Sequence, residues 1–173
     1  MKEWIAVGYE VFALRGLPGL KVEALAAKVG ISKSSFYHHF ADVPVFVEAL
    51  LKTHLEQAAR IAASERAARS IDPDLINILV AHKTDLLFNR QLRIHQDNPA
   101  FRDTLHKANQ IIGTDFIALW SAHTKAQLTP SQWEGLFSLA LENFFLQINS
   151  ENLTRTWLTE YFHRLSTIVR SFG

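Results

Sequence analysis

Histidine is the residue type through which this chain could do metal or acid–base chemistry, because imidazole binds metal ions and exchanges protons near neutral pH. The sequence has eight histidines and no cysteine. His38 and His39 are adjacent, so in a helix their side chains diverge by about 100° and cannot readily share one ion. Five of the other six histidines are candidate metal ligands, but they show no HExxH or comparable ligand spacing: His82, His95, His106, His123 and His163. We therefore predict no metal site, and the lack of cysteine excludes disulfides, thiol nucleophiles and cysteine-ligated zinc.

The other common patterns of catalysis are also missing from the sequence. It has no glycine-rich phosphate loop, no Gly-x-Ser-x-Gly elbow and no carboxylate pair that its spacing singles out. We therefore predict that the protein is not an enzyme, has no catalytic residue and takes no cofactor. The alternative is an enzyme that uses a cavity between helices. In that case turnover would survive Tyr37→Ala and be lost with His82→Ala or His123→Ala.

Residues 22–40 place hydrogen-bonding side chains on a compact helical frame. Apolar residues recur there at three and four positions, which puts Val22, Leu25 and Val29 on one face of a short helix. Gly30 can end that helix because glycine tolerates positive φ. We expect the next residue, Ile31, to enter the shared core, and the Ser32 hydroxyl to cap a second helix by accepting a backbone N–H bond.

The second helix should begin at Lys33 and present a polar face to DNA. Phe36 and Phe40 share one face of this helix, while Ser34 and His38 point almost the opposite way, flanked by Ser35 and Tyr37. Small serines allow close approach to a groove, and hydroxyl and imidazole groups can reach phosphate or base edges. The pattern is typical of a helix-turn-helix with a recognition helix. The alternative is a helical corner with an ordinary solvated face.

The same residues resemble the DNA-binding signature of the TetR family over roughly residues 4–50. The matching residues are Gly16, Val22, Leu25-Ala26, Gly30-Ile31-Ser32-Lys33 and Tyr37-His38-His39-Phe40. The resemblance implies that residues 33–39 enter the major groove and that Tyr37, with His38 or His39, contacts the DNA backbone. It also implies a homodimer whose repression is relieved by a ligand in the C-terminal bundle.

We predict two roles for the DNA-binding residues. Lys33, Ser34 and Ser35 should face base edges, and the other contacts should be mainly to phosphate. The predicted DNA-binding residues are Lys21, Ser32, Lys33, Ser34, Ser35, Tyr37, His38 and His39.

Three residues depart from the family pattern. Lys21 stands where a capping Thr or Ser is usual, Ser34 where Gly is common, and Val43 where a Lys usually contacts phosphate. Few residues precede the first expected helix, so we expect no minor-groove contacts from an arm. Together with a formal net charge of only +1, these departures favour a second hypothesis, a helical interaction protein whose reading head has lost DNA function.

Composition points to a packed globular protein with a local basic patch. The chain has 173 residues, of which 48% are hydrophobic, which is enough for a substantial core. Residues 15–39 carry four basic residues against one acidic residue, so DNA affinity must come from this patch and not from a global field. No run approaches the roughly 20 apolar residues of a membrane span. We predict a cytoplasmic protein with no membrane partner.

The remaining sequence predicts an all-α fold. Three capping residues precede a proline, at Asp72-Pro73, Asn98-Pro99 and Thr129-Pro130, and each pair should start a helix. Asp42 should cap a long helix that reaches about residue 68. We expect further helices over 2–15, 75–91, 100–126, 131–149 and 154–171, and we see no alternating strand pattern. We predict a helix-turn-helix domain over 1–45 and a ligand-binding and dimerisation domain over 46–173.

The last two expected helices carry more apolar surface than one chain of this size needs. A helix that is apolar nearly all round must be covered on both sides, and a second subunit is the expected cover. The alternative is an entirely intramolecular core. The predicted interface residues are Trp133, Phe137, Ala140, Leu141, Phe144, Trp157, Tyr161, Leu165 and Ile168.

An effector pocket between bundled helices would need aromatic walls and a few polar groups. We predict that an unidentified, largely apolar small molecule binds such residues, although aromatic residues at helical spacing also build ordinary cores. The predicted ligand-binding residues are His82, Phe88, Phe116, Trp120, His123, Asn143 and Phe144. The family resemblance implies a ligand-relieved, dimeric repressor. Its operator should be a near-palindrome, because two-fold symmetry sets recognition helices about 34–36 Å apart.

Overall fold

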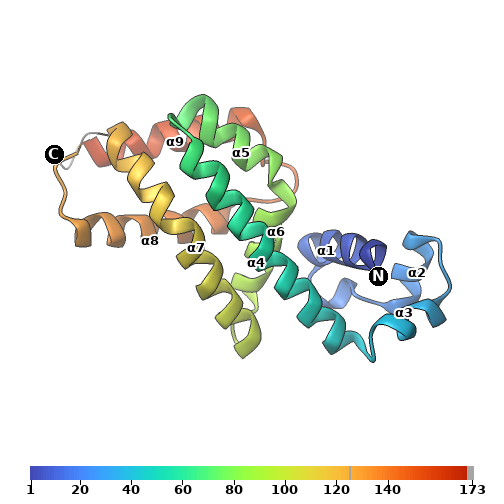
Figure 1. Cartoon of the computed structure of the whole chain (residues 1–173). Helices are drawn as coiled ribbons and strands as arrows, with labels where there is room; N and C mark the ends of the chain where they lie inside the picture. The colour runs from blue at the N-terminus through green and yellow to red at the C-terminus, as the bar shows by residue number, and fades with distance from the viewer. Residues whose placement is uncertain (125, 171–173) are drawn as a thin grey trace. The chain divides into compact units, whose positions relative to one another are not determined.

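Capping residues, glycines and prolines divide the chain into helices (Figure 1). The computed structural model describes residues 1–124 and 126–170, and it has no strand within these ranges. The α-helices are α1 (Lys2–Arg15), α2 (Val22–Val29), α3 (Lys33–His39), α4 (Val43–Ala67), α5 (Ile76–Ala81), α6 (Lys83–Ile94), α7 (Pro99–Thr124), α8 (Pro130–Gln147) and α9 (Arg155–Arg170). Two short helical segments are η1 (Leu17–Gly19) and η2 (Ile71–Leu75). The all-α prediction is confirmed. The predicted end of the last helix, at position 171, lies outside the described residues.

Most of the predicted helix starts are confirmed by their caps. The Val45 N–H donates to Asp42 Oδ1 at 2.9 Å, at the start of α4. The Ala100 N–H donates to Asn98 Oδ1 at 2.9 Å, and α7 begins at the intervening proline. Thr129 caps α8 reciprocally with Gln132, each side chain accepting a bond from the other's backbone N–H.

Two helix boundaries were predicted wrongly. Ser70, not Asp72, caps η2, since its hydroxyl accepts from the Asp74 N–H. Asp72 is unavailable because its carboxylate accepts hydrogen bonds from Arg155 and Thr159. The helix expected over 75–91 is also broken at His82, whose φ of −102° and ψ of 27° end α5 before α6 begins.

The chain forms two compact units. The first comprises Met1–Gln57 and Thr84–His106, and the second comprises Ala58–Lys83 and Lys107–Gly173. Helices α4 and α7 each contribute residues to both units. The helix-turn-helix therefore shares its compact unit with α6 and the start of α7.

Aromatic packing fixes the first unit. Phe36 of α3 has no exposed surface, and its ring lies 5.3 Å from Trp4 of α1 and 5.2 Å from Phe46 of α4, measured between ring centroids. Gly8 lets α1 come this close to α4, since a Cβ at this position would lie 2.2 Å from Phe46 Cζ. Any larger side chain at position 8 must push this buried ring aside.

A second aromatic cluster holds the second unit together. Phe116 of α7 lies 5.2 Å from Phe137 of α8 and 6.0 Å from Phe162 of α9, between ring centroids. Trp120, one turn after Phe116, is fully buried and lies 5.5 Å from Trp133 of α8. Much of the apolar surface of α8 and α9 is therefore covered within one chain. No helix of the described residues has the length and apolar character to cross a membrane.

We expect Gly8→Ala to destabilise the protein by about 1–3 kcal/mol, because the new methyl group overpacks a core that is already filled by Phe46. Urea unfolding followed by circular dichroism measures this loss. Glu10→Ala, on an exposed position of the same helix, is the matched control and should change stability by less than about 0.5 kcal/mol. An equally stable Gly8→Ala protein would contradict the close approach of α1 and α4.

Candidate nucleic-acid interface and effector domain

The turn between α2 and α3 depends on a single glycine conformation. Gly30 has φ 75° and ψ 24°, in the left-handed region, and its N–H donates to the Ala26 carbonyl at 2.9 Å. Open space surrounds the position of an added Cβ. The backbone conformation, not crowding, is therefore what selects glycine here.

The outward face of α3 is the face that the sequence predicts. Phe36 and Phe40 are 0% and 4% exposed and pack behind the helix, with ring centroids 5.2 Å apart. Tyr37 is 57% exposed. The side chains of Lys33, Ser34, His38 and His39 are exposed as well, and Ser35 is half-buried. A polar surface one helix wide thus faces solvent, as groove entry requires. Contact of these residues with DNA stays a prediction.

Two details of the turn differ from expectation. Ile31 is 37% exposed rather than buried in the core, because its backbone continues the turn by donating to the Ala26 carbonyl at 3.2 Å. The Ser32 hydroxyl makes no capping bond to a backbone N–H and instead lies 2.9 Å from the Ser34 hydroxyl. Lys21 precedes α2 without a side-chain cap, since an ammonium group has no acceptor.

Lys33 has an acidic neighbour on the same surface. Its Nζ lies 3.5 Å from Glu23 Oε1, and both side chains are largely exposed. A backbone hydrogen bond at Glu23 and then the Lys33 ammonium lower the pKa of the Glu23 carboxyl. Such an exposed pair contributes little to stability and is screened by salt. Lys33 can therefore exchange this carboxylate for a phosphate or a base edge.

A buried polar network that sequence reasoning missed joins three helices of the first unit. The Tyr9 hydroxyl of α1 donates to Asp85 Oδ1 of α6 at 2.8 Å, and lies 2.7 Å from His54 Nδ1 of α4. Because the tyrosine proton goes to the carboxylate, His54 must donate from Nδ1. Among the described residues, the other ring nitrogen of His54 has no hydrogen-bond partner. This arrangement fits a neutral imidazole.

Burial explains the charge states in this network. It lowers the pKa of His54 to about 4, against a smaller opposing effect of Asp85. Burial, followed by the Asp85 carboxylate, raises the pKa of Tyr9. Phe88, a predicted ligand-binding residue, stacks on both rings, with centroids 4.3 Å from Tyr9 and 4.6 Å from His54. Its contact with a ligand stays a prediction. The available sequence signal was the place of His54 in the apolar stripe of α4, between Leu50 and Ala58.

We expect Tyr9→Phe to lower the free energy of unfolding by about 1–3 kcal/mol, because it leaves the Asp85 carboxylate and the His54 N–H buried without their shared partner. Urea unfolding measures the change. Tyr37→Phe removes the same hydroxyl from an exposed ring and should leave stability within about 0.5 kcal/mol of the parent. Equal stability of Tyr9→Phe and the parent would refute the network.

The second unit contains an isolated buried acid. Glu65 of α4 is 2% exposed, and within the part of the chain that is described its Oε2 has no hydrogen-bond partner. Burial, and then the nearby Asp115 carboxylate of α7, raise the pKa of Glu65 to about 8. Asp115 itself pairs with Arg66 at 3.1 Å. Glu65 is therefore protonated in the folded protein at neutral pH.

Because Glu65 is protonated in the folded protein, the free energy of unfolding should depend on pH. A variant at position 65 measures this dependence separately from that of other groups. The folded pKa of Glu65 lies above its ordinary 4.5, so its contribution is fully present below pH 4.5 and is lost as pH rises towards about 8. Glu65→Gln mimics the protonated acid and should gain stability over the parent by up to about 3 kcal/mol between pH 4.5 and 7. His54, whose effect runs the other way, is unchanged in this comparison.

Urea unfolding of the parent and Glu65→Gln at a series of pH values tests this. The matched control is Glu56→Gln, on an exposed position of α4, whose difference from the parent should stay constant with pH. If the Glu65→Gln difference also stays constant, the acid is ionised in the fold and the burial argument is wrong.

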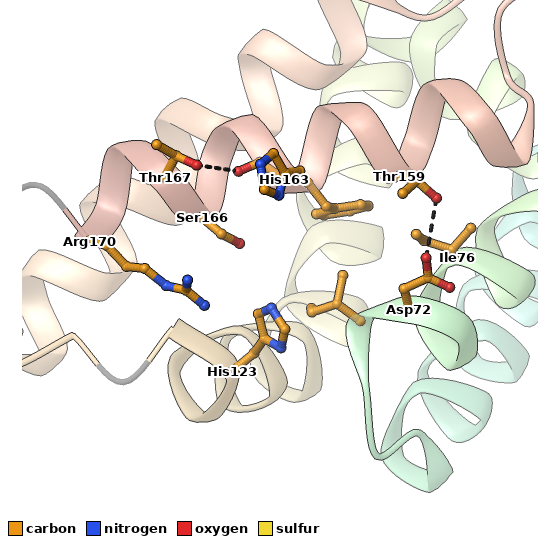
Figure 2. Close-up of a pocket in the computed structure, with 10 residues that line it drawn as sticks. Asp72, Ile76, His123, Thr159, His163, Ser166, Thr167 and Arg170 are labelled. Carbon is orange, nitrogen blue, oxygen red and sulfur yellow. Dashed lines mark hydrogen bonds between the residues drawn. The ribbon is translucent and has the colours of Figure 1, made fainter.

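The described residues of the second unit also contain a cavity of about 230 Å³ between η2, α5, α7 and α9. His123 of α7 faces Ser166 and Arg170 of α9 across it, and His163 lines the same wall (Figure 2). Of these four residues, only His123 was predicted to bind a ligand. The signal it missed is a polar stripe on α9, at positions 159, 163, 166 and 170, with helical spacing of four, three and four residues.

The other predicted ligand-binding residues do not meet in this cavity. Phe116 and Trp120 belong to the aromatic cluster beside Phe162, and Asn143 Oδ1 accepts hydrogen bonds from Gln147 and Tyr161. Phe144 packs 5.4 Å from Tyr161, and His82 ends α5. Ligand contact by these residues stays a prediction. No group of three or more potential metal ligands occurs among the described His, Asp and Glu residues.

The predicted dimer residues differ in how much surface one chain leaves available. Trp133, Ala140, Phe144 and Tyr161 are buried within the chain, and Phe137, Leu141, Trp157 and Leu165 are half-buried. The Tyr161 hydroxyl donates to the Ala140 carbonyl at 2.9 Å, and burial raises the pKa of Tyr161 to about 12. Ile168 is 51% exposed, and two leucines that the prediction omitted, Leu139 and Leu146, are 72% and 80% exposed.

Several known proteins resemble this chain in sequence or in fold. Residues 5–42 match the family model described as bacterial regulatory proteins, tetR family. A transcriptional regulator from Rhodococcus sp. Rha1 is 16% identical, with a TM-score of 0.66, and the match covers 99% of this chain and 96% of that one. No curated protein matches the sequence.

Two further solved structures share the fold. A Rhodococcus protein assigned to the TetR-family transcriptional regulators is 20% identical, with a TM-score of 0.57, over 98% of this chain and 100% of its own. The multidrug binding protein EbrR, solved in complex with proflavin, is 22% identical, with a TM-score of 0.53, over 95% of this chain and 98% of its own. The similarity therefore extends over both units of the chain.

Proposed function

We propose that this chain, whose residues 5–42 match the family model described as bacterial regulatory proteins, tetR family, is a sequence-specific transcriptional repressor that a small molecule releases from DNA. The observation that carries the proposal is the outward face of α3, where Lys33, Tyr37 and His38 are exposed while Phe36 is fully buried behind them. A polar helix face locked from behind by aromatic rings is what insertion into a major groove needs.

The contacts divide by reach and chemistry. Lys33, Ser34 and Ser35 stand in the first turn of α3 and face base edges, where a lysine can donate to a guanine. Tyr37, His38 and His39 contact phosphate groups of the DNA backbone. Lys21, exposed at the start of α2, adds a phosphate contact. Lys21 and Lys33 supply local positive charge that the whole chain, at net +1, lacks.

The repressor acts as a homodimer that pairs through α8 and α9. Leu139 and Leu146 lie seven residues apart on α8, so they occupy one face of that helix, and both are largely exposed. Ile168 of α9 is 51% exposed. Two-fold pairing through these residues buries apolar surface that one chain leaves in water, and it places two recognition helices on a near-palindromic operator.

The effector binds in the C-terminal helices, and the functional division falls near residue 45. Residues 1–45 read DNA, and residues 46–173 bind the ligand and the partner subunit. EbrR, which shares the fold, was solved with proflavin, which supports a small-molecule effector here. A coupling of about 1–3 kcal/mol, or roughly 5–150-fold in DNA affinity, is enough for the switch. We place the protein in the cytoplasm, where its operator would lie.

Selection of bound sites from random DNA duplexes tests the function. We expect a near-palindromic motif with half-sites about one helical turn apart, and Lys33→Ala should weaken binding by about 1–3 kcal/mol at one base position in each half-site. Lys28→Ala, which removes the same charge from an exposed position of α2, should have a smaller effect that does not depend on sequence.

The outcomes separate the hypotheses. A Lys33→Ala loss that is equal on all sequences, with a shallower salt dependence, would make Lys33 a phosphate contact. If no motif is selected, and the protein gives no gel shift with the DNA upstream of its own gene, the repressor proposal is refuted. A helical interaction protein is then favoured.

A further inference from the structure

The cavity of the second unit has a polar wall on α9 that includes one buried hydroxyl, that of Ser166. Ser166 of α9 is only 6% exposed, and Figure 2 shows it on the same side of the helix as Arg170, with His123 of α7 opposite. Neighbouring positions of α9, such as Phe162 and Val169, supply its packing face. Of the four stripe residues, only Ser166 is buried, whereas Thr159, His163 and Arg170 line the cavity from exposed positions.

The cavity lining has an excess of positive charge, because its carboxylate already accepts hydrogen bonds from the chain itself. Among the described lining residues, Asp72 is the sole carboxylate. Its Oδ1 accepts from Arg155, and its Oδ2 accepts from Thr159 at 3.4 Å. Both oxygens are thus occupied at one end of the cavity. The other end presents the Arg170 guanidinium, the two imidazoles and the Ser166 hydroxyl, and within the described ranges no carboxylate forms an ion pair with Arg170.

The rest of the lining is apolar. Ile71 and Ile76 are 3% and 0% exposed, and Phe162 is 5% exposed, so these buried side chains give the cavity an apolar surface. The volume of about 230 Å³ is below the roughly 300–1,000 Å³ of drug-sized sites. At ~30 Å³ for each water molecule it has room for one ring or a short branched chain.

We propose that this cavity binds a small carboxylate with an apolar body, its carboxylate held by Arg170, His123, His163 and the Ser166 hydroxyl, and its body against Phe162, Ile71 and Ile76. This inference rests on the proposed repressor function, for which it names the chemical class of the effector. The proposed effector site therefore lacks most of the aromatic residues that the sequence predicted to bind a ligand.

The chemistry of the donors selects this class. A guanidinium offers a planar fork of N–H donors that matches a carboxylate, and a buried hydroxyl adds a directional bond. A cationic ligand would meet the positive charge of Arg170 and find the Asp72 carboxylate already taken. Inorganic phosphate would satisfy the donors but leave Phe162 and both isoleucines without a contact. A carboxylate with an apolar body uses both walls.

The site also has a route to the DNA-reading unit along the chain. The segment η2 that lines the cavity continues through α5 into α6. Helix α6 carries Asp85, which accepts the Tyr9 hydrogen bond from α1. A ligand that repositions η2 can therefore act on α6, and through Asp85 on α1, along a covalent connection that runs through α5.

Calorimetric titration of the full chain with benzoate and with isovalerate tests the site. We expect at least one of them to bind, and its neutral amide, benzamide or isovaleramide, to bind at least tenfold more weakly. Arg170→Gln should lower the carboxylate affinity at least tenfold, and Ser166→Ala should lower it by a smaller factor. Arg164→Gln, which removes the same charge from an exposed position of α9 outside the cavity, should leave it unchanged.

Several results would overturn the proposal. These are no binding of either carboxylate at millimolar concentration, equal binding of acid and amide, phosphate binding as tightly as the carboxylates, or equal losses in Arg164→Gln and Arg170→Gln. Tighter binding of the cation proflavin at this site, detected by competition with benzoate, would also overturn it. Circular dichroism of each variant shows whether it is folded, and Arg170→Lys gives a second variant that keeps the charge and loses the fork.

Operator release is measured separately from ligand binding. If the carboxylate binds but leaves operator affinity unchanged, the cavity is not the effector site and the regulatory half of the inference fails. If other chemicals release the operator while no carboxylate binds, the inference fails and the repressor function stands. If no DNA is selected while the carboxylate binds as described, the repressor function fails and the ligand site stands.

Discussion

The position of α3, the helix that we propose enters DNA, depends on the burial of one ring. Phe36 has no exposed surface, and it meets Trp4 of α1, Phe40 beyond α3 and Phe46 of α4 at centroid distances of 5.2–5.3 Å. Three aromatic neighbours fix the rotation of α3 about its axis, because turning the helix would withdraw this ring from the core. The side chains opposite Phe36, including Ser34 and His38, are held outward by the same contacts.

Buried titratable groups divide between the two units and have opposite effects on stability. In the first, the neutral His54 donates to Tyr9, and its lowered pKa weakens folding as pH falls from about 6.5 to about 4. In the second, the protonated Glu65 weakens folding as pH rises from 4.5 towards about 8. The two effects oppose each other between about pH 4.5 and 6.5. A flat pH profile of the whole protein would therefore hide two strongly perturbed groups.

The polar cavity and the aromatic cluster show two uses of the same helices. On α9, Phe162 belongs to both, since it contacts Phe116 and lines the cavity, whereas Ser166 and Arg170 serve the cavity alone. The Tyr161 hydroxyl donates a hydrogen bond to the Ala140 carbonyl of α8, and this bond links the two helices that we propose for dimer pairing. Helix α9 therefore contributes to the cavity and to the internal core, and we propose that it also contributes to subunit pairing.

Local sequence determined the all-α fold, the caps at Asp42, Asn98 and Thr129, the glycine turn and the outward face of α3, because each depends on spacing within a few residues. Sequence did not reveal the Tyr9, His54 and Asp85 network or the raised pKa of Glu65, since these depend on groups brought together from distant helices. It also grouped aromatic residues as one pocket, although Phe88 and Phe116 belong to different compact units. Periodicity tells which side of a helix is apolar, but only tertiary packing decides whether that side, or a polar stripe such as that of α9, faces a core, a cavity or water.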